Sequence, residues 1–212
     1  MNSTPFDPRA TQMCESGGAG VSFRETMAGG FTLGVTEPRI GARATTLLAM
    51  HATIHIEDIK TFTADSQYRA GLTGHIDFPP FGPGIPAESG VFSLFMPSGE
   101  PALTYMVYEL GFQHDGKSYY LAGKKQVRLG GFWKLWGETT TLYCTLHEGI
   151  DSTGPVVGAG ILRLGVIELI KILTTAHATN AATKRESAEA LWQFFKFFVV
   201  KLMHIYVLQR PD

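Results

Sequence analysis

The segment Gln113–Lys117 reads Gln-His-Asp-Gly-Lys and lies between two strongly apolar stretches. Its central Asp-Gly pair is typical of a type I′ turn, which needs positive φ at both central residues and joins two antiparallel strands. Counting outward from this turn places Phe112 opposite Tyr119 and Leu110 opposite Leu121. The sequence therefore predicts a hairpin with one buried face, and a shift by one residue would turn that face to solvent. The buried face consists of Met106, Tyr108, Leu110, Phe112, Tyr119 and Leu121.

Other segments show strand patterns as well. The clearest is Thr45–Glu57, in which Met50, Ala52, Ile54 and Ile56 point to one side. Further strands are predicted at 21–26, 72–78, 90–96, 139–146 and 156–164. The 24 glycines and 14 phenylalanines suit many turns and an aromatic core. We therefore predict an all-β fold, an antiparallel barrel close to the lipocalin or calycin group, with a two-sheet sandwich as the alternative.

The two ends of the chain differ from this central part. Residues 1–20 lack the apolar stretch of a secretory signal and are predicted to form a flexible arm, while 21–212 form a single barrel domain. A short helix is predicted at 166–173 and a long C-terminal helix at 184–208. Two lysines and a histidine in the long helix argue against a membrane span, so we expect it to pack on the sheet. Phe197 and Val200 fall within its polar arc, which leaves a homodimer or a lipid surface as alternatives.

The charge and the cysteines restrict the partners and the compartment. The formal net charge is −1 and no basic run exists, so a nucleic-acid partner is not predicted. Cys14 and Cys144 lie far apart in the sequence, and two reduced thiols in a cytoplasmic protein are expected rather than a disulfide. Cys144 and His147 are three residues apart, which sends them to opposite faces of a strand. A buried, inert cysteine is therefore expected.

Two pairs of polar residues are the weak candidates for catalysis. His55 and Glu57 share one face of a predicted strand, and His75 and Asp77 share one face of the next. Antiparallel pairing could bring the four together, and two histidines with a carboxylate are able to bind a divalent metal. The simpler interpretation is a polar face with a hydrogen bond or two. We therefore predict neither a metal nor a cofactor.

Aromatic residues are more plentiful than a few hairpins need. A barrel of about eight strands has room for one small apolar ligand near its mouth. Two loops are expected to flank that mouth: Pro79–Pro86, in which proline prevents strand pairing, and Gly130–Gly137. An aromatic core without a cavity is an equal alternative. The residues predicted to line the site are Trp133, Trp136, Tyr108, Phe112 and Phe95.

Four sequence blocks occur in an order that resembles a known domain. They are Phe31–Gly34, Leu72–Asp77, Gly90–Phe95 and Leu135–Tyr143. The chain is similar to a bacterial domain that accompanies cholesterol-oxidase-like flavoproteins of the glucose-methanol-choline oxidoreductase group, near an α/β-hydrolase domain. The segment Leu129–Phe132 departs from the acidic residues and proline expected there. The resemblance implies an accessory unit in sterol or lipid metabolism and assigns no catalytic residue.

Three functions follow from these observations. The first is a non-catalytic module that binds a sterol, fatty acid or similar molecule beside a lipid-oxidising flavoenzyme. The second is a small barrel enzyme that uses His55, His75 and a carboxylate. The third is an interaction protein that forms a homodimer or docks onto the oxidase through its last helix.

Overall fold

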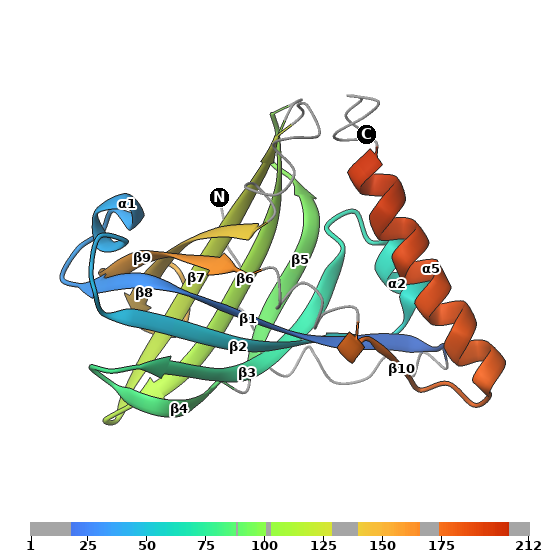
Figure 1. Ribbon diagram of the computed structural model, residues 1–212, viewed down its shortest axis with the longest axis horizontal. Coiled ribbons are helices and arrows are strands. Elements are labelled where there is room, and N and C mark those ends of the chain that lie inside the picture. The colour runs from blue at the N-terminus through green and yellow to red at the C-terminus, as the bar shows by residue number, and fades with distance from the viewer. Residues whose placement is uncertain (1–17, 88, 101–102, 129–139, 166–173, 204–212) are drawn as a thin grey trace.

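The computed structural model describes residues 18–87, 89–100, 103–128, 140–165 and 174–203. Within these ranges the chain is mainly β-structure, with two short helices and one long one (Figure 1). The strands are β1 (Gly20–Leu33), β2 (Leu47–Ile56), β3 (Arg69–Phe78), β4 (Gly82–Ala87), β5 (Ser89–Pro97), β6 (Leu103–His114), β7 (Lys117–Arg128), β8 (Thr141–Glu148), β9 (Val156–Leu164) and β10 (His177–Thr179). The helices are α1 (Pro38–Gly41), α2 (Ile59–Ala64) and α5 (Lys184–Met203).

Eight of the strands form a closed antiparallel barrel. Their order is β1-β2-β3-β5-β6-β7-β8-β9, and β9 pairs again with β1 to close the ring. The two remaining strands are additions to this ring, because β4 pairs with β3 and β10 pairs with β1. The predicted all-β barrel is therefore confirmed, and the two-sheet sandwich is excluded because closure leaves no separate second sheet.

The β6–β7 hairpin follows the predicted register throughout. Asp115 and Gly116 have φ angles of 48° and 74°, as a type I′ turn requires. Phe112 pairs with Tyr119, and Gly111 pairs with Tyr120. The predicted inward face is buried except for Tyr119, which is partly buried.

The proline-rich segment differs from its prediction as an unpaired loop. Residues 82–87 form β4, which is hydrogen-bonded to β3. The prediction was wrong because proline is tolerated where a strand has a free edge, and Pro83 and Pro86 are both exposed. Phe81, at the turn before β4, stacks near Phe112 and Tyr119, with ring centroids 6.3 and 5.0 Å away. The segment therefore covers the end of the barrel at the β6–β7 turn.

Helix α5 covers the other end of the barrel, beside α2 (Figure 1). It begins at Lys184 as predicted, and residues 204–208 of the predicted helix lie outside the described residues, as does the predicted helix at 166–173. The ring of Phe194 lies 5.4 Å from that of Phe23, and the ring of Phe198 lies 5.8 Å from that of Phe95. No helix among the described residues is long and apolar enough to cross a membrane.

Phe197 and Val200 have different environments, although both were assigned to the polar arc of the helix. Phe197 packs against the rings of Phe62 and Tyr68, at centroid distances of 5.8 and 5.0 Å. The prediction was wrong for Phe197, because α2 and the turn after it cover that side of α5. Val200 is 40% exposed. Among the described side chains of α5, the large exposed apolar ones are Trp192, Val199, Val200 and Met203.

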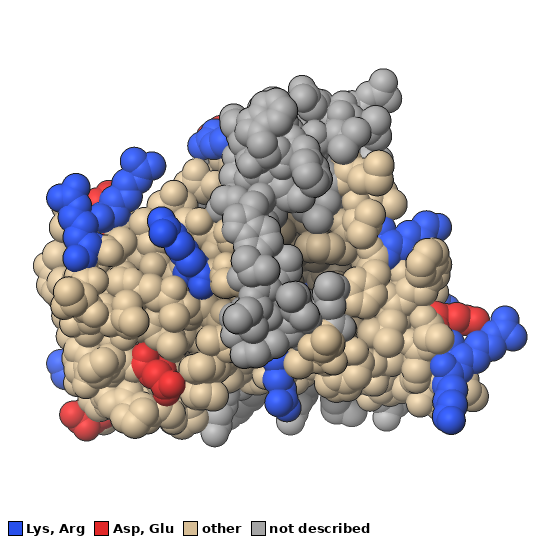
Figure 2. Space-filling model, viewed as in Figure 1, with Lys and Arg blue, Asp and Glu red and all other residues tan. Residues whose placement is uncertain are grey.

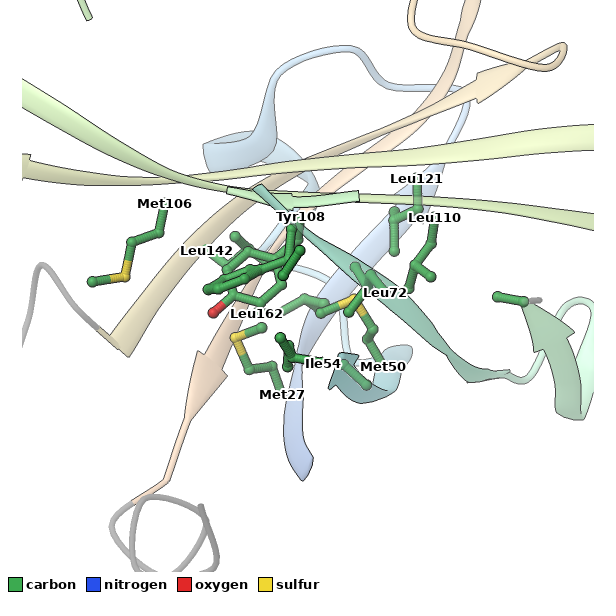
Figure 3. Close-up of a cluster of buried hydrophobic side chains, with 14 of the residues drawn as sticks. Met27, Met50, Ile54, Leu72, Met106, Tyr108, Leu110, Leu121, Leu142 and Leu162 are labelled. Atoms are coloured by element: carbon green, nitrogen blue, oxygen red, sulfur yellow. The ribbon is translucent and has the colours of Figure 1, made fainter. Parts of the chain in front are cut away.

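The interior of the barrel holds the apolar core. Inward side chains from the barrel strands gather around Tyr108, as Figure 3 shows for one group of them. The labelled members are Met27, Met50, Ile54, Leu72, Met106, Tyr108, Leu110, Leu121, Leu142 and Leu162. In the view of Figure 2, the charged side chains of the described residues lie mainly toward the two sides, and uncharged residues cover much of the remaining described surface.

Candidate functional site: a polar triad inside the barrel

Three polar side chains meet within the apolar interior. Glu25 comes from β1, Tyr108 from β6 and Lys125 from β7, and their relative exposures are 4%, 3% and 2%. Glutamate and lysine are almost never so deeply buried unless they are paired. The three residues therefore form a site that needs a structural or functional reason, and we call it the interior triad.

Lys125 connects the other two members of the interior triad. Its Nζ donates a hydrogen bond of 2.9 Å to the hydroxyl of Tyr108 and lies 4.6 Å from the centroid of the same ring. Its distance to Oε2 of Glu25 is 3.8 Å, which makes an ion pair without a close hydrogen bond. Among the described residues, Oε1 of Glu25 is a buried side-chain atom with no hydrogen-bond partner.

Strand alternation explains why these side chains face inward. On β1, Glu25 continues the inward row of Val21, Phe23 and Met27. On β7, Lys125 is two residues from Gly123, which pairs with Tyr108. A Cβ at Gly123 would lie 2.9 Å from the side chain of Leu142, so a larger residue there would require Leu142 to move. Lys125 thus reaches Tyr108 along the inner face of the hairpin.

Burial governs the protonation of the interior triad. Desolvation, together with the neighbouring carboxylate of Glu25, raises the pKa of Tyr108 well above its ordinary value, so the phenol stays neutral. Desolvation lowers the pKa of Lys125, and the charge of Glu25 opposes that change. The interior triad holds one carboxyl group and one amino group, so a further anion in the site would have no cation of its own.

Oε1 of Glu25, the buried oxygen without a hydrogen-bond partner, determines what the interior triad is able to bind. A carboxylate oxygen accepts hydrogen bonds and cannot donate them while it is ionised. Apart from Tyr108, the core side chains labelled in Figure 3 carry hydrocarbon and thioether groups, which offer no strong donor. The site is therefore suited to receive a hydroxyl group or a water molecule.

Sequence reasoning identified one member of the interior triad and missed two. Tyr108 was predicted to line a ligand site, whereas Glu25 and Lys125 were not considered. A signal for Lys125 was present, because the hairpin register that places Leu121 inward also places Lys125 inward. For Glu25 the signal was a charged residue at an inward position of an alternating segment.

The other predicted lining residues do not join the interior triad. Phe95 packs on Phe198 of α5, and Phe112 lies four residues beyond Tyr108 on β6, toward the β6–β7 turn. Both are buried in the same apolar core. Trp133 and Trp136 lie outside the described residues, together with the predicted loop that contains them.

The four weak catalytic candidates are divided between two places on the outer face. His55 pairs with Gly71 and its Nε2 lies 2.9 Å from Oγ1 of Thr73. Glu57 follows the end of β2 and is exposed. His75 pairs instead with His51, and Asp77 lies 3.2 Å from His51. In the observed register His51, and not the predicted His55, is the neighbour of His75 and Asp77. None of the four candidates faces the interior of the barrel.

Cys144 is a free thiol in the barrel core and is fully buried. Burial raises its pKa strongly, which suppresses the thiolate needed for nucleophilic attack. His147 is held by Oγ1 of Thr145 and the carbonyl of Gly154, at 2.9 Å each. The geometry therefore agrees with a buried, inert cysteine rather than a Cys-His pair. Cys14 lies outside the described residues.

The fold and the interior triad together define an eight-stranded antiparallel β-barrel with a polar centre. Comparison with family models, with curated proteins and with solved structures found no match for this chain. The resemblance to the domain of cholesterol-oxidase-like flavoproteins therefore stays a prediction based on its four sequence blocks.

Proposed function

We propose that this protein is a non-catalytic module that binds a hydrophobic small molecule inside its barrel, with a hydroxyl group of the ligand donating to Glu25. The observation that carries the proposal is the buried, unpartnered Oε1 of Glu25 in an apolar interior. A buried acceptor without a donor costs about 1–3 kcal/mol, and more when it is charged. A ligand hydroxyl would remove that cost on binding.

The charges of the interior triad favour a neutral ligand. Lys125 already balances Glu25, so a fatty acid would bring a second carboxylate to a site without a spare cation. A sterol or a long-chain alcohol offers one donor on an apolar body. Among the two ligand classes expected from the sequence, the interior triad therefore supports sterols over fatty acids. Met27, Met50 and Met106 line the same core, and methionine side chains readily adapt their shape to a guest.

The test is a matched ligand panel. Native mass spectrometry of the full chain should reveal a bound apolar molecule after expression or after incubation with cholesterol. A long-chain alcohol should bind more tightly than the alkane or the fatty acid of equal chain length. The proposal is wrong if the alkane and the alcohol bind equally, or if none of the ligands binds.

Two variants connect the ligand preference to the carboxylate. Glu25→Gln keeps the size of the side chain but removes its charge, and it should reduce the preference for the alcohol over the alkane by about tenfold, the equivalent of one hydrogen bond to a charged group. Glu109→Gln is the matched control, because Glu109 lies on the outward face of β6. The control should keep the preference of the unchanged chain.

We further propose, from the sequence resemblance, that the loaded module works beside a flavoenzyme that oxidises lipid alcohols. The support is chemical agreement: a cholesterol-oxidase-like flavoprotein acts on an apolar alcohol, which is the ligand type that the interior triad favours. At limiting sterol, the loaded chain should accelerate such an oxidase, and the chain with Glu25→Gln should accelerate it less. Equal rates with both chains would contradict the partnership. The free, buried thiol of Cys144 fits the proposed cytoplasmic location.

A second candidate is self-association through α5. Trp192 is 69% exposed and Met203 is 49% exposed on this helix, and large exposed apolar side chains are typical of contact surfaces. Size-exclusion chromatography with light scattering tests this candidate directly. A dimer that becomes a monomer with Trp192→Glu would support self-association, whereas a monomer in both chains would exclude it.

The small-enzyme alternative receives less support. It requires His55 and His75 in one cavity with a carboxylate, and both lie on the outer face of the barrel in different cross-strand rows. The residues that do meet on this face lead to a different inference.

A further inference from the structure

A second polar cluster lies on the outer face of β1, β2 and β3. The register places Thr26 opposite His51 and His51 opposite His75, so three side chains form one cross-strand row. Asp77 is two residues beyond His75 and therefore shares its face. One nitrogen from each histidine and one carboxylate oxygen of Asp77 all lie within 4.8 Å of one another.

The spacing of these atoms suits a small divalent cation. Nε2 of His51 and Oδ2 of Asp77 are 3.2 Å apart. Two ligands of a tetrahedral zinc ion are separated by roughly 3.3 Å, given bond lengths of about 2.0–2.1 Å. The rings of His51 and His75 are stacked, with centroids 4.4 Å apart and planes at 14°. His75 is exposed, and one of its ring nitrogens lies within 4.8 Å of a ligand atom of His51 and of Asp77.

Outer hydrogen bonds orient two of the three ligands. Nδ1 of His51 lies 3.1 Å from Oγ1 of Thr26, and the N–H of Gly84 donates a 2.7 Å hydrogen bond to Oδ1 of Asp77. These contacts engage Nδ1 of His51 and Oδ1 of Asp77. They leave Nε2 of His51 and Oδ2 of Asp77, which are 3.2 Å apart, as the atoms available to an ion. Such support of the ligands by a neighbouring hydroxyl or backbone group is typical of protein metal sites.

The cluster is also accessible. The side chains of His51 and Asp77 are 31% and 44% exposed, and His75 is exposed. An ion can therefore enter without a change in the barrel, and water can complete its coordination.

We propose that His51, His75 and Asp77 form a binding site for a divalent transition-metal ion with the coordination chemistry of zinc, on the outer face of the barrel and apart from the interior triad. Three protein ligands and at least one water satisfy the usual coordination of an open zinc site. A metal ion on Nε2 of His51 leaves the ring proton on Nδ1, from which it is donated to Oγ1 of Thr26.

The test is calorimetric titration of the metal-free full chain with zinc chloride near neutral pH. Cobalt(II) serves as a second probe, because its visible absorption reports on nitrogen and oxygen ligands directly. His75→Gln and Asp77→Asn should each abolish or greatly weaken binding. Thr26→Val should weaken binding about tenfold through the loss of the outer hydrogen bond. Circular dichroism should show that each variant remains folded.

His55→Gln is the matched control. His55 lies on the same strand and the same outer face as His51, and it also contacts hydroxyl groups, those of Ser22 and Thr73. This variant should bind zinc as the unchanged chain does. The proposal fails if the unchanged chain binds neither metal, if His75→Gln binds normally, or if His55→Gln loses as much affinity as His75→Gln.

Discussion

Replacing Lys125 with methionine tests whether the buried charges act as one unit. Methionine keeps an unbranched side chain of similar length but removes the ammonium group, which leaves the carboxylate of Glu25 uncompensated in the core. Removal of one member of a buried pair costs about 3–5 kcal/mol. The total stability of a domain is typically about 5–15 kcal/mol, so the free energy of unfolding should fall by a large fraction.

Removing both charges should recover most of this loss. In the chain with Glu25→Leu and Lys125→Met, apolar groups replace the pair, a change that is often neutral or stabilising by about 1–4 kcal/mol. We therefore expect the double variant to unfold at a higher urea concentration than either single variant. The interaction energy of the double-mutant cycle should amount to several kcal/mol, which is above the usual range for distant sites.

Urea unfolding, followed by circular dichroism, measures the free energy of unfolding of the unchanged chain, the two single variants and the double variant under one set of conditions. Lys124→Met is the matched control, because Lys124 neighbours Lys125 but is exposed. An exposed substitution of this kind should change the free energy of unfolding by no more than about 0.5 kcal/mol. Equal losses in Lys124→Met and Lys125→Met, or a double variant whose loss is the sum of the two single losses, would refute the reasoning.

Three further predictions concern local features. Asp58→Ala removes the acceptor of the Thr61 N–H at the start of α2 and should cost about 1 kcal/mol. That hydrogen bond lowers the pKa of Asp58 from 3.8, so the unfolded chain protonates first, and the measured difference from the unchanged chain should shrink as the pH falls below 3.8. With the other cysteine replaced by serine, Cys144 should not react with Ellman's reagent until urea unfolds the chain, and prompt reaction would contradict its burial. Phe197→Glu should lower the free energy of unfolding by about 2 kcal/mol and Val200→Glu by less than about 0.5 kcal/mol, and equal effects would show that the packed face of α5 is misassigned.

Local chemistry explains which parts of the fold were predictable. The β6–β7 register follows from one turn, because Asp115 and Gly116 fix both the turn type and every pair counted outward from it. The cap of α2 follows in the same way from Asp58. The pairing of β4 was not predictable from its prolines, because tolerance of proline depends on whether the neighbouring edge is free, which is a property of the whole sheet.

The candidate sites required information that no local pattern holds. Glu25 and Lys125 are a hundred residues apart and meet only because the barrel closes. Each residue alone appears as a charge in an alternating strand, and the usual interpretation of such a charge is exposure. The outer cluster depends on the β2–β3 register, and a connection that contains α2 joins these strands in place of a tight turn. With no turn to fix the count, His51 and His55 were equally available partners for His75.

Strand β1 connects the two sites, because consecutive residues on it point to opposite faces. Glu25 faces the interior triad, and Thr26 faces outward to His51. The β1–β2 register, which pairs Met27 with Met50 and Thr26 with His51, fixes the positions of Glu25 and Thr26 together. A slip of β1 by one residue would bring Thr26 into the core and turn Glu25 to solvent, so it would remove the charge partner of Lys125 and the hydrogen-bond partner of His51 together. The register of β1 is therefore constrained by polar contacts on both sides of the barrel wall, in addition to the apolar pattern that the sequence displays.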